Sequence, residues 1–400
     1  RTDPMLRACN VAGHLQCGGA TAPSTAPVQD LTYSRKFPNG TCFILLDRPR
    51  KKNAMTLAMF MELTRLILEA RMDSNVKVVV ISSETPGLFC AGGDMRELTG
   101  RPSWPEWYLT FTEYRLDHLI HTLPKPLITL LDGSCMGGGC GLGVHIHNRC
   151  FRVVTENVRL AMPETGAGWV PDCGAHDFFR HVPSPVGLFL GLTGAVLDYK
   201  DCMYCGIATH FVRTQDLPQL KELLRNRDLG KCPEQSIAEI LGEVSTPVDG
   251  ISTIQKHFSE ISRCYGAYSV EEILSRLKAE ASEWADNQIQ LLSHRSPLSL
   301  KLTLGFYYRV KWFNWDYQRI CAQSFIFAQH LMSDFREGVK SLLLDKAYTP
   351  KYKFNSLSEI SPEIVAKYFS SETMIESVGE KMHSFPLRMP RNLPFFVGKK

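Results

Sequence analysis

Apolar segments of strand length alternate with amphipathic segments of helix length through the first half of the chain. Three short segments have the apolar character of strands buried on both faces: 41–47, 76–82 and 127–131. Between the first two, residues 54–70 place four apolar side chains at helical spacing: Phe60, Leu63, Ile67 and Ala70. A further helical segment, 104–123, ends before Pro124. This alternation predicts an α/β fold with parallel crossover connections.

The second half of the chain has a different pattern, with few strand signals. Five segments from residue 186 onward are predicted to be helical: 186–194, 217–224, 270–281, 298–308 and 317–332. We therefore divide the chain into an α/β core over 31–195 and a helical region over 196–370.

The two ends differ in composition from the rest of the chain. Between Met5 and Gln29 there is one Arg and no Asp or Glu, among many Ala, Ser and Thr. This composition is typical of a mitochondrial transit peptide, and a plain extended N-terminus over 1–30 is the alternative. After Glu380 the chain has five basic residues, three prolines and no acid. We expect residues 371–400 to form a basic, extended tail.

Overall charge and apolar content exclude two function classes. The chain of 400 residues has 45 Lys plus Arg and 41 Asp plus Glu, a net charge of +4. This balance does not favour a protein whose whole surface coats nucleic acid. No apolar stretch approaches the roughly 20 residues of a membrane-spanning helix, so no membrane partner is expected.

The cysteines and histidines do not predict a metal site. The 13 cysteines are scattered among apolar residues, which indicates buried free thiols in a reducing compartment. Cys202 and Cys205 form a single C-x-x-C, and no second pair at zinc spacing follows. His145 and His147 have no nearby carboxylate or cysteine to complete a ligand set. We interpret them as part of an ordinary surface element.

Two glycine-rich turns follow apolar strands, at residues 89–94 and 137–141. Glycines let a backbone approach a ligand closely, and two backbone N–H groups aimed at one oxygen form an oxyanion hole. Neither turn has the spacing of a phosphate-binding loop. Each turn alone is also compatible with a simple tight turn.

Two carboxylates stand eight residues apart, and each follows a proline in apolar, glycine-rich sequence. They are Glu164 and Asp172. Apolar surroundings raise the pKa of a carboxyl, so either residue could serve as a base or a nucleophile. The alternative is that each caps a helix or a turn.

Four segments together resemble the crotonase (enoyl-CoA hydratase/isomerase) superfamily in sequence, order and spacing. They are RPRKKNAM at 48–55, FCAGGDMREL at 89–98, PLITLLDGSCMGGGCGLG at 126–143 and AMPETGAGWVPD at 161–172. The resemblance covers roughly residues 31–370. It implies a ββα spiral core of the crotonase type followed by a C-terminal helical region.

Within the superfamily the chain is most similar to the hydrolases of 3-hydroxyisobutyryl-CoA. Glu164 and Asp172 pair as in those hydrolases, and Gly141 stands where hydratases carry one of their two catalytic glutamates. The helical region also matches, through SPLSLKLTL, DFREGV and LLLDKAYTPKY. Ala175 and His176 depart from the run of glycines usual after the catalytic Asp, which leaves the substrate open.

The resemblance implies a role for each matching residue. The N–H groups of Gly93 and Gly138 would form the oxyanion hole, and Glu164 and Asp172 would be the catalytic carboxylates. Substrate-binding residues would be Glu113, Gly92 and Asp94. Coenzyme A would be bordered by Arg50, Lys51, Lys52 and Asn53, and a solvated loop is the alternative for the three basic residues.

Three functions remain in competition. The first is a thioester hydrolase of the mitochondrial matrix, a monomer or homodimer, that needs no cofactor because coenzyme A is part of its acyl-CoA substrate. The second is hydratase or isomerase chemistry, which would normally need a second acid at Gly141. The third is a structural subunit of the small mitochondrial ribosomal subunit, with the N-terminus and basic tail contacting ribosomal RNA and proteins.

Overall fold

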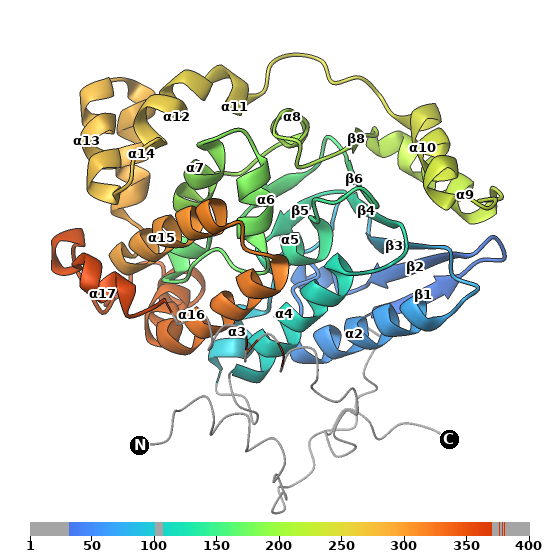
Figure 1. The fold of residues 1–400 in the computed structure, drawn as a ribbon, viewed down its shortest axis with the longest axis horizontal. Helices are drawn as coiled ribbons and strands as arrows, with labels where there is room; N and C mark the ends of the chain where they lie inside the picture. Colours follow the sequence, from blue (N-terminus) through green and yellow to red (C-terminus); the bar gives the residue numbers. More distant parts are fainter. Residues whose placement is uncertain (1–31, 101–106, 370–375, 377, 379, 381–400) are drawn as a thin grey trace, which may run out of the picture.

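Six strands form the main sheet, in the order β1-β2-β3-β4-β6-β8 (Figure 1). The structure is a computed structural model that describes residues 32–100 and 107–369, with Glu376, Val378 and Glu380. β1 runs antiparallel to β2, and every later neighbour is parallel. The strands are β1 (Thr32–Lys36), β2 (Thr41–Leu46), β3 (Val78–Ser83), β4 (Leu127–Leu131), β6 (Cys150–Val154) and β8 (His210–Phe211).

A second sheet of two parallel strands, β5 (Ser134–Met136) and β7 (Arg159–Ala161), lies beside the first. The three predicted strands correspond to β2, β3 and β4, and the α/β fold class is confirmed. β1 and β5–β8 were not predicted. The predicted N-terminal segment 1–30 and the basic residues after Glu380 lie outside the described residues.

Alternate residues of the central strands pack on opposite faces of the main sheet, as the two-residue period of a strand requires. On one face, side chains such as Ile44 join the larger core beneath α2 (Leu57–Met72). On the other face, side chains such as Phe43 join a smaller core. That smaller core is covered by α9 (Leu217–Asn226) and α10 (Pro233–Val244).

Two helices of the first half agree with the helical segments predicted at 54–70 and 104–123. All four residues of the predicted face in 54–70 are buried in α2. The predicted helix 104–123 is α4 (Trp107–His121), and residues 104–106 lie outside the described residues. The remaining helices of this half are α3 (Met95–Thr99), α5 (Gly138–Gly143), α6 (Ala175–His181) and α7 (Val186–Thr193), with 3-10 turns η1 (Pro49–Lys51) and η2 (Glu164–Ala167).

The second half is helical except for β8, which confirms the predicted change of character. An extended segment, 245–252, carries the chain from α10 to the helices at the opposite end of the molecule (Figure 1). These elements are α8 (Tyr199–Tyr204), η3 (Thr214–Asp216), α11 (Thr253–Lys256), α12 (Phe258–Tyr265), α13 (Val270–Glu280), α14 (Glu283–Ser293), α15 (Pro297–Phe313), α16 (Tyr317–Val339), the π-helical turn η4 (Lys340–Leu344), η5 (Leu357–Glu359) and α17 (Pro362–Ala366).

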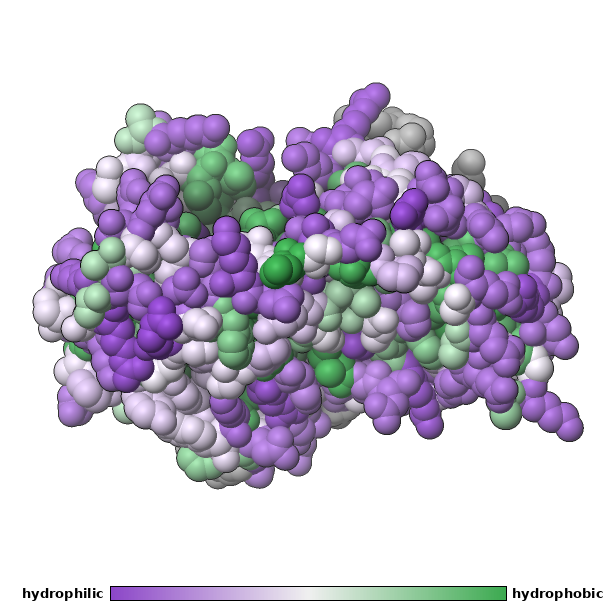
Figure 2. Space-filling model, turned by 90° about the horizontal axis from the view of Figure 1, so that it is seen from above, coloured by the Kyte–Doolittle hydropathy of each residue, from purple (hydrophilic) through white to green (hydrophobic). Residues whose placement is uncertain are grey.

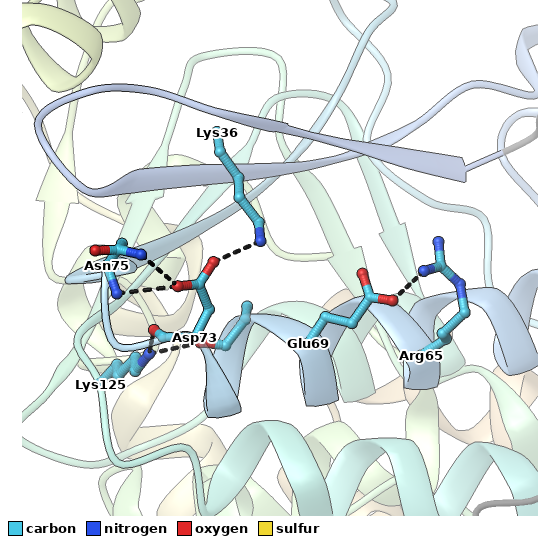
Figure 3. Close-up of polar contacts among 7 residues, drawn as sticks. Lys36, Arg65, Glu69, Asp73, Asn75 and Lys125 are labelled. Atoms are coloured by element: carbon cyan, nitrogen blue, oxygen red, sulfur yellow. Dashed lines mark hydrogen bonds and ion pairs between the residues drawn. The ribbon is translucent and has the colours of Figure 1, made fainter.

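Polar contacts fix the C-terminal end of α2 against the sheet (Figure 3). Lys125 donates to the carbonyl oxygens of Ala70 and Asp73, each at 2.6 Å, which satisfies acceptors that a helix end leaves free. The Asp73 carboxylate pairs with Lys36 of β1 at 2.6 Å and accepts from the Asn75 N–H at 3.0 Å. The end of α2, β1 and the segment before β4 are therefore held together.

The face seen from above is mainly hydrophilic, and hydrophobic side chains appear there as small separate patches (Figure 2). Small scattered patches are usual on a protein surface and do not by themselves indicate a binding face. Among the described residues, no helix combines the length and the apolar composition that crossing a membrane requires.

Candidate active site

The two glycine-rich turns lie directly against each other. The Cys90 N–H donates to the Ser134 carbonyl at 2.7 Å, and the Met136 N–H donates to the Cys90 carbonyl at 3.1 Å. Gly92 has a φ of +91°, and a Cβ there would lie 2.7 Å from the Met136 carbonyl oxygen. Only glycine accommodates both constraints. The contact between the turns therefore depends on Gly92.

The N–H groups of Gly93 and Gly138 are available to a ligand. Within the described chain, no hydrogen bond outside the regular helices and strands uses either group. Gly138 is the first residue of α5, where a helix leaves its N–H without an internal partner. Both glycines line one pocket. Their placement suits the expected oxyanion hole, which stays a prediction.

Three predicted carboxyl residues besides Asp94 line the same pocket: Glu113 of α4, Glu164 at the start of η2, and Asp172. A Cβ on Gly137 would lie 2.7 Å from Glu164 Oε1. A Cβ on Gly138 would overlap Glu113 Oε1. These glycines therefore leave room for the carboxyls as well as freeing the backbone.

Asp172 receives three hydrogen bonds. Its Oδ2 accepts from the Tyr114 hydroxyl and from the Trp169 indole N–H, each at 2.7 Å. Its Oδ1 accepts from the Cys173 thiol at 3.3 Å. Burial raises the pKa of Asp172, and these hydrogen bonds act in the opposite direction because they favour the charged form.

The other carboxyls have weaker support for a negative charge. Burial, reinforced by the nearby Asp172, raises the pKa of Glu113 to about 8. The same two causes raise the pKa of Glu164 well above its usual range, against smaller opposing effects of its own backbone N–H and of Arg295. Carboxyls with such raised pKa values hold protons near neutral pH and are typical of acid–base sites.

Several residues of this site were not predicted from the sequence. Tyr114 and Trp169 contact Asp172, and Arg295 lines the pocket. Phe335 and Leu342 complete one wall from the helical region. The only available signal was position, since Tyr114 follows Glu113 and Trp169 lies within the AMPETGAGWVPD segment.

The predicted coenzyme A loop lies beside the pocket but not in its wall. Arg50, Lys51 and Lys52 are exposed, and the Ala91 N–H donates to the Lys52 carbonyl at 3.0 Å, which ties the loop to the first glycine-rich turn. Their contact with coenzyme A stays a prediction.

Asn53 does not fit the role expected for its side chain. It is fully buried, and its amide donates to Ser83 Oγ at 2.9 Å and to the Phe89 carbonyl at 2.8 Å. Its side-chain oxygen also accepts from the Arg48 N–H at 2.7 Å. These bonds hold the loop in shape and leave no surface of Asn53 for direct contact with coenzyme A.

Asp94 borders the pocket while its carboxylate is used within the protein. It caps α3 by accepting from the N–H groups of Arg96 and Glu97, and it pairs with Arg48 at 2.8 Å. Asp94 therefore anchors the turn that carries Gly92 and Gly93. A direct contact with substrate stays a prediction.

The cysteine interpretation agrees with the structure, and the surface interpretation of the histidines is wrong for His145, while His147 is partly exposed. All described cysteines are free, and all except Cys232 are buried. His145, expected on the surface, is fully buried and lies 5.8 Å from the Tyr317 ring, centre to centre. An i, i+2 spacing cannot reveal that α16 covers this segment. Among the described residues, no group of three or more His, Cys, Asp or Glu is arranged to hold a metal ion.

Comparison with known proteins places this geometry in a family. Residues 41–369 match the family model described as enoyl-CoA hydratase/isomerase. This chain belongs to that family. A solved enoyl-CoA hydratase from Rhodobacter sphaeroides shares the fold, with a TM-score of 0.76 and 30% identity over 86% of this chain and 98% of that one. The expected crotonase-type fold is confirmed.

Two curated relatives represent different uses of the family. The chain is 33% identical over 381 residues to the mitochondrial 3-hydroxyisobutyryl-CoA hydrolase of Gallus gallus, covering 92% of this chain and 95% of the relative. It is 36% identical over 355 residues to the small ribosomal subunit protein mS47 of Neurospora crassa, covering 82% of this chain and 69% of the relative. The family model and the hydrolase are named for acyl-CoA chemistry, whereas the other relative is named as a ribosomal protein. The substrate of this member is therefore a separate question.

Proposed function

We propose that this protein is a mitochondrial matrix thioester hydrolase that converts 3-hydroxyisobutyryl-CoA and water into 3-hydroxyisobutyrate and coenzyme A, a step of valine degradation. The observation that carries the proposal is that Gly93 and Gly138, whose N–H groups have no hydrogen bond outside the regular elements of the described chain, share one pocket with Glu164 and Asp172. Similarity to mitochondrial hydrolases with that substrate in their names supports the choice of ester.

In this function the two glycine N–H groups bind the thioester oxygen as negative charge develops on it, which lowers the barrier by about 3 kcal/mol per donor. Glu164 and Asp172 handle the protons of water and of the leaving thiol, or Glu164 attacks the thioester carbon directly. Glu113 contacts the acyl group from α4. Arg50, Lys51 and Lys52 attract the phosphates of coenzyme A.

The space around Gly141 disfavours hydratase or isomerase chemistry. A Cβ at this position would lie 2.6 Å from Asp117 Oδ1 and 2.8 Å from Cys173 Cβ. The second glutamate expected of a hydratase therefore has no room here, because Asp117 and Cys173 already fill it.

The test is a hydrolysis assay across a panel of hydroxyacyl-CoA and enoyl-CoA esters, with free thiol as the readout. We expect release of coenzyme A from 3-hydroxyisobutyryl-CoA, lost in Glu164→Gln and kept in Glu243→Gln, which changes an exposed carboxyl on α10. Binding of the esters without turnover, or hydration of crotonyl-CoA at a higher rate than hydrolysis, would reject the proposal.

A second function is favoured by the similarity to mS47 of Neurospora crassa. We propose that the protein also associates with the small mitochondrial ribosomal subunit through its N-terminus and its basic tail, which lie outside the described residues apart from Glu376, Val378 and Glu380. Sedimentation of mitochondrial extract in a salt series tests this. Co-sedimentation that decreases as salt rises supports it, and a free protein at every salt concentration rejects it.

A further inference from the structure

Three aromatic side chains form an exposed patch at the end of the molecule where α15 lies between α13 and α17 (Figure 1). Tyr308 and Trp312 are one turn apart on α15, and their rings stack with centres 4.8 Å apart. The ring of Tyr268, just before α13, lies 5.0 Å from Tyr308 and 5.8 Å from Trp312. Tyr268 is 68% exposed and Trp312 is 60% exposed. A contiguous group of exposed rings, unlike a single one, is typical of an interaction surface, and we call these three residues the aromatic patch.

A cavity of about 400 Å³ continues from the aromatic patch between α13, α15 and α17. Tyr268 belongs to both the patch and the cavity wall. Apolar side chains from all three helices line the cavity, among them Val270, Leu304 and Val365. Patch and cavity therefore form one continuous surface with room for a bound segment of chain.

The charges at the rim of this surface do not favour a polyanion. Lys301 pairs with Glu271 at 2.6 Å, and the Glu271 side chain is 49% exposed against 15% for Lys301. Arg276 is likewise paired, with Glu272 at 2.7 Å. Arg309, the second cation of the cavity wall, donates to a carbonyl and lies over an aromatic ring of the same chain. The most exposed charge of the cavity is therefore a carboxylate, which suits a basic occupant better than RNA.

The C-terminal part of the described chain passes close to this surface. Phe369, after α17, lies under Arg309 of α15, with 3.6 Å between the guanidinium carbon and the ring centre. Farther along, Glu376 pairs with Arg319 of the first turn of α16 at 3.8 Å. Arg319 follows Trp312 by seven residues, so their Cα atoms are at most about 25 Å apart. The chain is thus near the aromatic patch shortly before residue 381.

Residues 381–400 lie outside the described residues, and their composition suits this surface. They include three phenylalanines, three prolines, five basic residues and no acid. Proline-containing segments bind aromatic-lined grooves because proline rings pack against aromatic rings and the segment loses little conformational entropy. Twenty residues can span about 60 Å, more than twice the bound between Arg319 and Trp312.

We propose that the aromatic patch and the adjoining cavity bind residues 381–400 of this same chain. The phenylalanine and proline side chains pack against the three rings, and the basic side chains lie near Glu271. Because the segment is tethered, its effective concentration is on the order of 1 mM, so a modest affinity is enough to hold it. This contact is independent of the proposed hydrolysis and of the proposed association with ribosomes.

Limited trypsin digestion of the full chain tests the contact, because the segment has cleavage sites after Arg388 and Arg391. Mass spectrometry follows the loss of the residues beyond them. Cleavage of a bound segment depends on the fraction of time that it is released. We expect Tyr268→Ala combined with Trp312→Ala to raise the cleavage rate several-fold.

Phe313→Ala is the matched control on the same helix. Phe313 is 67% exposed and follows Trp312 directly, and among the described residues its ring contacts none of the patch. Its loss should leave the cleavage rate unchanged. An equal rate in the unmodified protein and in the patch variant, or an equal rise in Phe313→Ala, would overturn the proposal.

A pair of changes in the segment itself leaves the described fold untouched. Phe395→Ser combined with Phe396→Ser should raise the cleavage rate as the patch variant does. Combining the patch and segment changes should add nothing further, because both break the same contact. Effects that simply multiply would show two independent causes and contradict the proposal.

The same variants distinguish two other occupants of the aromatic patch. A dimer in sedimentation velocity that dissociates in the patch variant, with cleavage unchanged, would assign the patch to a second copy of this chain. Binding of single-stranded RNA that is lost in the patch variant and kept in the segment variant would assign it to RNA. Either result would overturn the proposal.

Discussion

The two faces of the main sheet are built from the same strands, but the cores that they form differ in composition. On the smaller core, residues such as Val80 pack against the leucines and isoleucines of α9 and α10. On the larger core, the strands support the turns and α4, which carry buried carboxyls; one of them, Asp117, has no hydrogen-bond partner among the described residues. The smaller core contributes apolar packing alone, whereas the larger core combines apolar packing with the cost of buried polar groups. Changes on the two faces should therefore separate stability from activity.

Glu164→Gln should give the largest effect on the site face. We expect kcat to fall by roughly 10²- to 10⁴-fold, because a proton-transferring group is lost. The melting temperature should stay the same or rise, since the buried carboxyl is replaced by a neutral group of the same shape. A melting temperature that falls together with kcat would show that the two faces are not separable in this way.

Leu220→Ala tests the opposite face. Leu220 is fully buried between α9 and the sheet, and its truncation should lower the free energy of unfolding by about 2–5 kcal/mol. Urea denaturation measures this loss. The kcat of the folded protein should be unchanged at a temperature well below the transition.

Gly138→Ala should reduce kcat/KM by about 10²-fold, because the new Cβ overlaps Glu113 Oε1 and displaces that carboxyl. Gly93→Ala is the matched comparison, since a Cβ at Gly93 meets no atom within 4 Å. It should cost less activity than Gly138→Ala. Steady-state kinetics with the same ester measure kcat/KM for both variants. A lower kcat/KM in Gly93→Ala than in Gly138→Ala would contradict this description of the pocket.

Four carboxyls at and beside the pocket form a cluster in which burial raises the pKa of each member: Glu113, Asp117, Glu164 and Asp172. This carboxyl cluster should make stability fall as the pH rises. A carboxyl whose pKa is raised in the folded state keeps its proton there while the unfolded chain loses its own, so unfolding is favoured above the ordinary pKa. For Glu113 the window runs from its ordinary 4.5 to about 8. Each such group contributes a slope of up to about 1.4 kcal/mol per pH unit.

Asp117→Asn should remove one of these contributions and flatten the decline. Chemical denaturation between pH 5 and pH 8 measures the slope, and the variant should gain stability over the unmodified protein as the pH rises. Equal slopes would mean that Asp117 is ionised in the folded protein.

The smallest effect is expected outside both cores, at the exposed loop. Changing Arg50, Lys51 and Lys52 to Gln together should raise KM a few-fold, with kcat preserved, because exposed charges contribute about 1 kcal/mol or less. The difference should shrink as salt rises. If the variant and the unmodified protein have the same KM at low salt, the loop is simply solvated and does not bind coenzyme A.

Local sequence patterns predicted the features that depend on residues close together in the sequence. The strand 127–131 corresponds to β4, and the buried face of α2 follows from its periodicity. The two glycine-rich turns and the carboxyls at Glu164 and Asp172 were also recognisable in sequence, because each motif is contiguous. Their meeting in one pocket followed from the family resemblance rather than from spacing.

Features that depend on distant contacts were not predictable. Asn53 follows three basic residues and reads as exposed, yet it takes a φ of +54° and turns its amide inward. His145 is buried because α16 covers it from far along the chain. Asp117 lies at helical spacing from Glu113, but only the packing of Gly141 and Cys173 shows that it faces the cluster.

The wall formed by Arg295, Phe335 and Leu342 has a consequence for how the chain is synthesised. Every other part of the pocket lies between Ala91 and Cys173, in the first half of the chain. The ribosome synthesises the carboxyl residues and the glycine-rich turns well before Leu342, the last residue of the wall. The pocket therefore cannot be complete until Leu342 has been synthesised.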